Sequence, residues 1–330
     1  MDDDAASGTR PLDLLVVGEV NPDVVVSDPD PRPVFGQAER LVDKVRMTIG
    51  SSPAITACAA ARLGLRVAMV GVVGDDVFGR FTSGAMAERG IDVSAIRVTT
   101  DAPTGASVIL SDGRDRAILT ARGTIGAVTV RDIPPGMLEG ARHLHIGSWF
   151  LQDGLRPDAA ALLARAHGAG VTTSLDPNWD PTGDWDAGLR HLLPALDLLF
   201  LNEVELSRIV GVDGVDVAAE ELARLGRGGG GAGRSGPLVA VKCGAAGALV
   251  ASADGVLARV DAFPVRAVDT TGAGDTFDAG FLAAWLDGAS PMDALRAGAV
   301  AGAFATTALG GTDGQPTASE LAAALASWPA

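Results

Sequence analysis

Short apolar segments rich in β-branched residues alternate with segments of helical length along most of this chain of 330 residues. Leu12 to Val17 has the character of a buried strand, and an alanine-rich helix is expected from Ala54 to Leu63. Val67 to Val73 returns to the strand pattern, and a second helix is expected to open after Gly74-Asp75-Asp76. Strands that alternate with helices pair in parallel, because each helix returns the chain to the same edge of the sheet. The sequence therefore predicts an α/β fold whose mostly parallel sheet is covered by helices on both faces.

The same order continues through the C-terminal half. Strands are expected at 143–147, 171–175, 198–201, 238–242, 248–252 and 262–268, and helices at 157–169, 189–196, 292–308 and 317–326. The run from Gly226 to Gly236 contains seven glycines and no strand leads into it, so we expect a surface loop without a function.

A different pattern occupies residues 97–122. Two short alternating runs, Thr104 to Leu110 and Arg116 to Thr120, are separated by Ser111-Asp112-Gly113. Asp-Gly between such runs is typical of a β-hairpin. We expect this hairpin to project from the main sheet as part of a lid.

The composition limits the classes of partner. Hydrophobic residues make up 47% of the chain and charged residues 20%, which is enough apolar material for a globular core. Acidic residues outnumber basic ones by 41 to 26, and the net charge is −15. Nucleic acids and anionic membranes are themselves negatively charged, so neither is an expected partner. Small metabolites fit better.

Cysteine usage and the N-terminus favour a cytoplasmic protein. Cys58 and Cys243 are the only cysteines and both lie in apolar segments, which does not form a disulfide framework. Residues 1–10 are acidic and polar, unlike a signal peptide, and are expected to form a disordered tail before a single domain at 11–330. The chain has no uncharged apolar run of about 18 residues, so no membrane-spanning helix is expected.

The stretch from Arg266 to Phe281 carries the strongest sign of chemistry. A small glycine-rich turn, Gly272-Ala273-Gly274, leads into an apolar helix. The first N–H groups of a helix lack intrahelical partners and the helix dipole is positive there, so this turn can hold an anion such as a phosphate. Asp275 follows in the first helical turn, where a carboxylate can accept a proton from a nearby hydroxyl. Helix capping alone would also explain an Asp at this place.

Nine positions with one free position, Asp269-Thr270-Thr271-Gly272-Ala273-Gly274-Asp275-x-Phe277, resemble the C-terminal signature of the ribokinase (PfkB) family of carbohydrate kinases. Other landmarks of the family follow in order: Gly18 to Asp23, Gly71 to Gly79, Thr104-Gly105, Asp176-Pro177-Asn178, Asn202-x-x-Glu205 and Lys242-x-Gly244-x-x-Gly247. The resemblance implies a ribokinase-like three-layer sandwich with a small β-lid, whose segments would be about 24–48 and 97–122. Neither a P-loop nor a Rossmann glycine motif is present.

The resemblance also implies roles for individual residues. Asp275 would be the general base, and the amides of Gly272, Ala273 and Gly274 would bind the transferred phosphoryl group. Residues expected to bind the sugar are Asn21, Asp23, Gly50 and Ser51, and those expected to bind the nucleotide are Lys242, Gly244, Gly247 and Thr271. Taken without the resemblance, Asn21 and Asp23 are equally well explained as turn residues.

Two metal sites are implied in the same way. Asn202 and Glu205 would organise Mg²⁺ through water, since Mg²⁺ retains several waters and needs few carboxylates. Taken alone, the pair reads as a helix N-cap and a first-turn acid. Asp269 and Thr271, with carbonyl groups near 310–312, match a site for an activating monovalent cation such as K⁺. Asp75-Asp76 is expected to start a helix, and the pair His143 and His145 to be structural.

One position departs from the family pattern. The glycine pair of the N-terminal signature reads Gly50-Ser51 here, and the Asn expected four positions on, which contacts the sugar, is Ile55. Because Ile cannot make that hydrogen bond, either the acceptor lacks a hydroxyl there or another side chain, Arg116 or Trp149, replaces the contact.

These observations lead to three functional hypotheses. The first is an ATP- and Mg²⁺-dependent kinase that phosphorylates a hydroxyl, expected to be primary, of a sugar or sugar-like polyol. The second is a nucleoside kinase on the same fold, and the third is a non-catalytic regulator that binds sugar or nucleotide. The resemblance further implies a homodimer formed through the lid.

Overall fold

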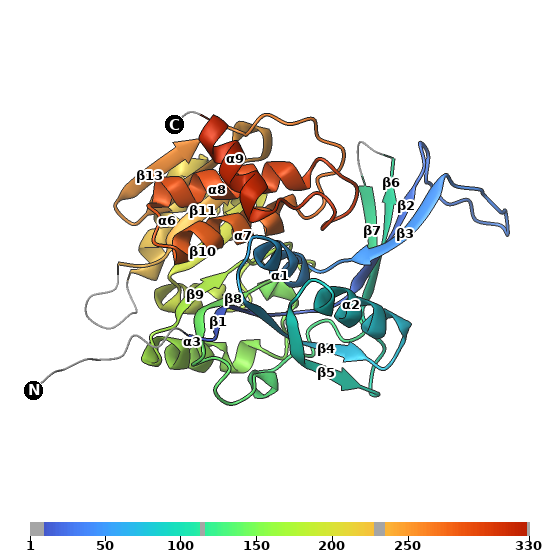
Figure 1. Ribbon diagram of the computed structural model, residues 1–330, viewed down its shortest axis with the longest axis horizontal. Helices are drawn as coiled ribbons and strands as arrows, with labels where there is room; N and C mark the ends of the chain where they lie inside the picture. The colour runs from blue at the N-terminus through green and yellow to red at the C-terminus, as the bar shows by residue number, and fades with distance from the viewer. Residues whose placement is uncertain (1–9, 113–115, 228–234, 329–330) are drawn as a thin grey trace, which may run out of the picture.

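The computed structural model describes residues 10–112, 116–227 and 235–328. Most of the predicted N-terminal tail, Gly113 at the predicted hairpin turn and most of the glycine-rich run lie outside these residues. The molecule has a large α/β body and a small sheet that projects from one side of it (Figure 1).

The main sheet has the order β13-β12-β11-β10-β9-β8-β1-β4-β5. Its strands are β1 (Leu12–Val17), β4 (Val67–Gly74), β5 (Asp92–Thr99), β8 (Ala141–Ile146), β9 (Thr172–Leu175), β10 (Leu198–Asn202), β11 (Leu238–Lys242), β12 (Ala248–Ser252) and β13 (Gly255–Val260). The strands from β5 to β11 in this order are parallel, and β12 and β13 complete the sheet antiparallel at one edge. The predicted mostly parallel sheet is confirmed.

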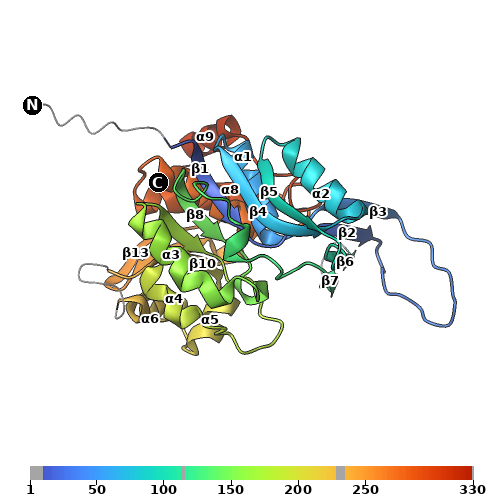
Figure 2. The ribbon, with the colours of Figure 1, turned by 90° about the horizontal axis from the view of Figure 1, so that it is seen from below.

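Helices cover both faces of this sheet, as Figures 1 and 2 show. One layer contains α1 (Ser52–Arg62), α2 (Val77–Ala87), α7 (Ala273–Leu286), α8 (Pro291–Ala305) and α9 (Ala318–Ser327), and the other contains α3 (Ala159–Gly168), α4 (Leu189–Leu192), α5 (Glu203–Val210) and α6 (Val215–Gly226). Strand β1 shows why both faces of the sheet need a helical layer. Its side chains alternate between faces, so Leu14 and Val16 pack with the first layer and Leu15 and Val17 with the second.

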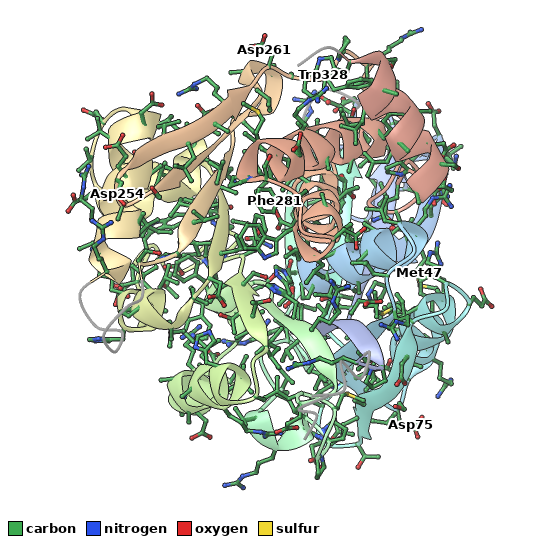
Figure 3. All side chains as sticks on the ribbon, turned by 60° about the vertical axis from the view of Figure 1, so that its left-hand side comes forward. Met47, Asp75, Asp254, Asp261, Phe281 and Trp328 are labelled. Atoms are coloured by element: carbon green, nitrogen blue, oxygen red, sulfur yellow. The ribbon has the colours of Figure 1, made fainter. Side chains whose placement is uncertain are left out.

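Apolar contacts anchor α7 in its layer. Phe281 of α7 is fully buried and packs edge to face (T-shaped) against Phe200 of β10, with ring centroids 5.3 Å apart. Figure 3 shows Phe281 inside the body, between helices and sheet. Aromatic pairs in this arrangement stabilise a core beyond their area, so the helix that carries Asp275 has a fixed place relative to β10.

The small sheet has the order β3-β2-β6-β7, with β2 (Pro22–Ser27), β3 (Lys44–Ile49), β6 (Ala106–Ser111) and β7 (Arg116–Ala121). We call it the lid sheet. Its strands come from the two segments expected to form a lid, except that 97–99 belong to β5 of the main sheet. The parallel pairing of β2 with β6 joins the two segments.

One expected strand is wrong. Residues 262–268 have no regular structure, although their composition is apolar. The segment includes Pro264, which has no N–H for a ladder, and the chain must return from the edge strand β13 to α7. The N–H groups of Val268 and Asp269 donate instead to the carbonyl of Thr306, beyond the end of α8. Among the described residues, the structure contains no helix that is both long and apolar enough to cross a membrane.

Candidate active site

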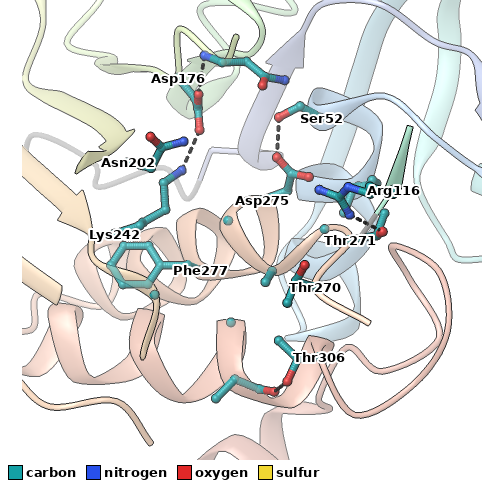
Figure 4. Close-up of a pocket in the computed structure, with 18 of the residues that line it drawn as sticks. Ser52, Arg116, Asp176, Asn202, Lys242, Thr270, Thr271, Asp275, Phe277 and Thr306 are labelled. Atoms are coloured by element: carbon teal, nitrogen blue, oxygen red, sulfur yellow. Dashed lines mark hydrogen bonds and ion pairs between the residues drawn. The ribbon is translucent and has the colours of Figure 1, made fainter. Parts of the chain in front are cut away.

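A cavity of about 840 Å³ lies where the lid sheet faces the carboxyl ends of the parallel strands. Its walls include Asp23 and Arg116 of the lid sheet, Lys242 at the end of β11 and Asp275 of α7. Figure 4 shows Arg116, Lys242 and Asp275 around it. Ligands of open α/β sheets bind at this end of the strands, because the loops there are free to present polar groups. The cavity therefore brings together most of the site residues predicted from the sequence.

Asp275 is the third residue of α7, and its side chain borders the cavity. The hydroxyl of Ser52, in α1, donates a hydrogen bond to its carboxylate (Figure 4). The pKa of Asp275 is raised to about 6, mainly by burial. Asp176 contributes to the rise, whereas Ser52, Lys242 and Arg116 oppose it. A carboxylate with a pKa close to neutrality, next to a cavity, is suited to accept a proton.

The turn before α7 depends on a glycine in the left-handed conformation. Gly272 has a positive φ of 72°, and a Cβ there would lie 2.5 Å from the carbonyl oxygen of Gly311. Only glycine fits this position without strain. The N–H of Ala273 donates to the carbonyl of Thr270 at 3.3 Å, which closes the turn. Gly274 and Asp275 follow in the first turn of the helix, where N–H groups point away from the helix body.

The cavity is also lined by three of the four residues predicted to bind sugar. Asn21 and Asp23 are nearly buried and line the cavity, as does Ser51. Gly50 packs directly behind Asp23, since a Cβ there would lie 2.1 Å from an oxygen of that carboxylate. Burial raises the pKa of Asp23 to about 7.

Glu19 is a lining residue that sequence reasoning missed. Its carboxylate accepts a hydrogen bond from Gln152 at 2.5 Å, and burial raises its pKa to about 7. Glu19 lies with Asn21 in the turn after β1. Its place at the end of a strand was the one feature of the sequence that could have indicated a cavity residue.

Asn202 and Glu205 form a capping box. The side-chain oxygen of Asn202 accepts from the N–H groups of Val204 at 2.9 Å and Glu205 at 3.0 Å, and the Glu205 carboxylate accepts from the N–H of Asn202 at 2.8 Å. The capping interpretation is thus confirmed. Both side chains also line the cavity, where burial raises the pKa of Glu205 to about 7.

Lys242 points into the base of the cavity rather than into solvent. Its ammonium lies 2.7 Å from Asp176 and 3.1 Å from Asp278. Sequence reasoning missed Asp278, although its spacing of three residues from Asp275 places it on the same face of α7. Gly244 and Gly247 line the cavity beside Lys242, and Gly247 has a φ of 93° with the Val260 carbonyl 2.0 Å from where a Cβ would be.

Asp269 fixes the turn before α7 through hydrogen bonds. Its carboxylate accepts from the N–H of Thr271 at 2.9 Å, from the Thr271 hydroxyl at 2.7 Å and from the N–H of Gly310 at 2.8 Å. Arg116 of β7 donates to the Thr271 hydroxyl at 2.5 Å (Figure 4), and its guanidinium lies 3.9 Å from Asp269. The lid sheet thus contacts the turn that begins α7.

Comparison with known proteins identifies the family of this chain. The family described as pfkB family carbohydrate kinase matches residues 12–318. The chain belongs to this family. The pfkB-family kinase is 33% identical over 314 residues to an ATP-dependent ribose-1-phosphate kinase of Halopiger xanaduensis. The matched region covers 94% of this chain and 97% of the relative. It is 33% identical over 292 residues to a fructokinase of Klebsiella pneumoniae, which covers 84% and 91%.

Its fold is also that of a solved structure, the ribokinase of Arabidopsis thaliana complexed with ribose and ATP. The TM-score is 0.79 at 23% identity, over 95% of this chain and 98% of that one. The predicted ribokinase-like fold is confirmed. Membership of a kinase family also favours an enzyme over the non-catalytic regulator.

Ile55, which stands where the family pattern has Asn, lies at the cavity of this pfkB-family kinase. Ile55 is nearly buried and lines the cavity, and a Cβ on Gly311 would lie 2.5 Å from its tip. The side chain therefore packs against the loop that follows α8. Of the two replacement contacts considered, Arg116 lines the cavity, whereas Trp149 is buried in the core.

Other expectations concerned residues outside the cavity of this kinase. Asp76 is the N-cap of α2, which confirms the expected helix start. His143 hydrogen-bonds Thr172 and Ser174, and His145 hydrogen-bonds Ser174, which confirms their structural role. Within the described ranges, no group of three or more His, Cys, Asp and Glu side chains is arranged to hold a metal ion.

Proposed function

We propose that this pfkB-family kinase transfers the γ-phosphoryl group of ATP to a hydroxyl, expected to be primary, of a sugar or sugar-like polyol. The observation that carries the proposal is the shared cavity of Asp275, the turn at 272–274 and the polar pair Asn21 and Asp23. A hydroxyl held by that pair would be in the same cavity as a base and an anion site. Phosphoryl transfer depends mainly on such positioning and on electrostatic stabilisation.

Each part of the site has a role in this proposal. Asp275 takes the proton of the acceptor hydroxyl, which is worth about 100- to 10,000-fold in rate. The amides of the first turn of α7 stabilise the charge on the transferred phosphoryl group. Lys242, Gly244, Gly247 and Thr271 line the side of the cavity assigned to the nucleotide.

The carboxylate of Glu205 and the amide of Asn202 offer oxygen atoms to the cavity, which fits Mg²⁺ held through water. When bound, Mg²⁺ would neutralise part of the phosphate charge. Asp269 is kept as the candidate for a monovalent cation, K⁺, next to Thr271. We also propose that the protein is cytoplasmic, since ATP is abundant there.

A nucleoside is the second candidate acceptor, because one wall of the cavity is apolar. Ile109 and Ile118 of the lid sheet line it together with Ile125 and Leu151. Such a wall can pack against a nucleobase while Asn21 and Asp23 bind the ribose hydroxyls.

A panel assay separates the candidates. ADP release with MgATP is measured over free sugars, including ribose and fructose, over ribose 1-phosphate and over nucleosides. A sugar or polyol is expected to give the highest kcat/KM, and preference for nucleosides would establish the second candidate. No ADP release with any acceptor in the panel would contradict both.

The outer face of the lid sheet supports a homodimer. Cross-strand register places Met47, Val24, Val108 and Leu119 in one row across its four strands. Leu119 is 64% exposed and Met47 37%. Since an exposed apolar row of this kind is typical of an interaction surface, we propose that two copies pair through it.

A further inference from the structure

The first turn of α1 reaches the carboxylate of Asp275. Ser52 is the first residue of α1, and its hydroxyl donates a hydrogen bond to Asp275 Oδ1, as Figure 4 shows. Both side chains line the cavity, and Ser52 is nearly buried. A hydrogen bond to an ionised acceptor is stronger than one between neutral groups. The contact therefore joins two helices at the carboxylate proposed as the base.

The backbone before Ser52 is held in an uncommon conformation. Ser51 has a φ of 70°, in the left-handed region that residues with a side chain rarely adopt. Its hydroxyl donates to the carbonyl of Glu19 and accepts from the N–H of Ala54 at 3.3 Å. Such conformations persist where surrounding contacts impose them, and they concentrate at active sites. The chain thus enters α1 with Ser52 in a fixed place.

A buried glutamine links the same two helices next to this contact. The side-chain amide of Gln315, in the loop between α8 and α9, donates to the carbonyl of Ile55 at 3.0 Å and to the Thr276 hydroxyl at 3.3 Å. Ile55 belongs to the first turn of α1, and Thr276 follows Asp275 in α7. Gln315 is 2% exposed. The first turns of α1 and α7 are therefore held at a fixed separation, and Ser52 stays within reach of Asp275.

A carboxylate that is held through one oxygen leaves the other oxygen for the acceptor. Oδ1 of Asp275 accepts from Ser52, and no described residue donates a hydrogen bond to Oδ2. The Ser52 contact fixes the orientation of the carboxylate, so an acceptor hydroxyl can approach Oδ2 without displacing it. A base must lie within hydrogen-bond reach of the proton that it takes. A misplacement of about 1 Å can lower a rate by about 100-fold.

We propose that Ser52 is a positioning residue for Asp275, whose hydroxyl holds Oδ1 so that Oδ2 stays directed at the acceptor hydroxyl. The proton of the acceptor passes to Oδ2 as the acceptor oxygen bonds to the γ-phosphorus and ADP leaves. The Ser52 proton stays on its own oxygen throughout. The sequence alone gave Ser52 no role. The inference rests on the proposed function, because it takes Asp275 as the base.

Ionisable groups on other elements also surround Asp275. Burial is the largest effect on the pKa of Asp275 and raises it, and the Ser52 hydrogen bond opposes that rise. The titratable and charged groups around this carboxylate are Glu19 after β1, Asp23 of β2, Arg116 of β7, Asp176 after β9, Glu205 of α5, Lys242 of β11 and Asp278 of α7. Substitutions at Ser52 leave all of them in place, so a change in titration can be assigned to the hydroxyl.

The test compares Ser52→Ala with Ser52→Thr at pH 8, well above the pKa of about 6 of Asp275. Ser52→Ala is expected to lower kcat by about 10- to 100-fold, the effect of losing a hydrogen bond to a charged group, with KM for MgATP and for the acceptor within about threefold of the wild type. Ser52→Thr keeps the hydroxyl and is expected to retain most of the wild-type kcat. Thr56→Val is the matched control, because it removes a buried hydroxyl one turn later in α1, outside the lining of the cavity, and should leave kcat unchanged.

A second readout follows the base itself and needs no acceptor. In protein labelled with ¹³C at aspartate carboxyl carbons, the Asp275 signal is identified by its loss in Asp275→Asn. Its titration midpoint is expected to rise by about one pH unit in Ser52→Ala, because a hydrogen bond to the ionised form favours that form. The midpoint should stay in place in Ser52→Thr and Thr56→Val. A Ser52→Ala variant with unchanged kcat and midpoint would overturn the proposal, as would a raised KM for the acceptor at unchanged kcat.

Two controls keep the result clear. Circular dichroism and thermal unfolding check the fold of each variant. If Ser52→Ala does not fold, Ser52→Cys replaces it, because a thiol is close in size to the hydroxyl but a weak donor, and it is expected to lower kcat and raise the midpoint in the same direction. If Asp275→Asn retains wild-type turnover, the proposed function itself fails. An inactive Asp275→Asn together with wild-type kcat in Ser52→Ala rejects the role of Ser52 alone.

Discussion

The carboxylate of Asp275 must be ionised to accept a proton, and its surroundings oppose ionisation. Burial is the largest effect on its pKa, and Asp176 adds to it. The Ser52 hydroxyl, Lys242 and Arg116 act in the opposite direction. The balance leaves a carboxylate that is ionised near neutral pH yet basic enough to take a proton, which is the compromise that the proposed general base requires.

The pH profile is the first consequence at this scale. The pKa of Asp275 is raised to about 6, and a general base acts only in its ionised form. If Asp275 is the proposed base, kcat/KM is expected to fall as pH decreases through about 6. The limiting slope on the acidic side is about tenfold per pH unit. Initial rates between pH 5 and 8 with a stable acceptor would check this. A flat profile over that range would argue against a raised pKa at the base.

At the scale of elements, the turn before α7 depends on backbone conformation. Gly272 has a positive φ and faces the Gly311 carbonyl, whereas Gly274 lies in the regular first turn of the helix. The two glycines of this motif are therefore under different structural constraints. Gly272 is required by the path of the chain, whereas a Cβ at Gly274 would make only an ordinary contact with Lys242, at 3.4 Å.

Alanine substitutions separate these constraints. Gly272→Ala is expected to lose at least about 1–2 kcal/mol of unfolding free energy from the left-handed conformation alone, with a further cost from the 2.5 Å contact. Gly274→Ala is the matched control, because its Cβ would meet Lys242 at 3.4 Å without backbone strain. Thermal unfolding would measure both. Equal losses in the two variants would contradict this account of the turn.

A comparison of the expected and observed helices and strands shows how far the sequence predicts this structure. The alternation of strands and helices is a local pattern, so the parallel sheet and its order of elements were predictable. The segment 262–268 was not, because its apolar residues line the cavity or stay exposed, and only Phe263 stacks on α8, against Phe304. Asp278 and Glu19 each had a local signal, helical spacing from Asp275 and a place at the end of a strand, but neither belongs to a motif that would have singled it out.

For the whole molecule, the acidic cavity affects stability. Burial raises the pKa values of Glu19 and Asp23 to about 7, well above those of an unfolded chain. The folded protein therefore binds more protons than the unfolded chain between about pH 4 and 7, and stability decreases as pH rises through this range. His143 and His145 have lowered pKa values and act in the opposite sense, but only below about 6.5.

Stability is thus expected to fall between pH 6.5 and 8, by on the order of 1 kcal/mol for each of the two carboxyl groups. Urea unfolding of the ligand-free protein at several pH values would measure this. Asp23→Asn, which cannot ionise, should reduce the decrease. A stability that rises over this range would show that these groups are not buried in acid form.

The lid sheet gives a second prediction for the whole molecule. If two copies pair through its outer face, light scattering should detect a dimer, and Leu119→Lys should give a monomer. Val77→Lys, at an equally exposed apolar residue at the start of α2, serves as the control and should remain dimeric. A monomeric wild-type protein at micromolar concentration would reject this interface.

The most direct test of the account is Asp275→Asn, assayed for ADP release with the best acceptor found in the panel. The amide keeps the shape of the side chain but cannot take the proton of the hydroxyl. We expect kcat to fall by about 100- to 10,000-fold, with an unchanged circular dichroism spectrum and retained binding of MgATP. Turnover within about threefold of the wild type would show that Asp275 is not the base and would contradict the central claim.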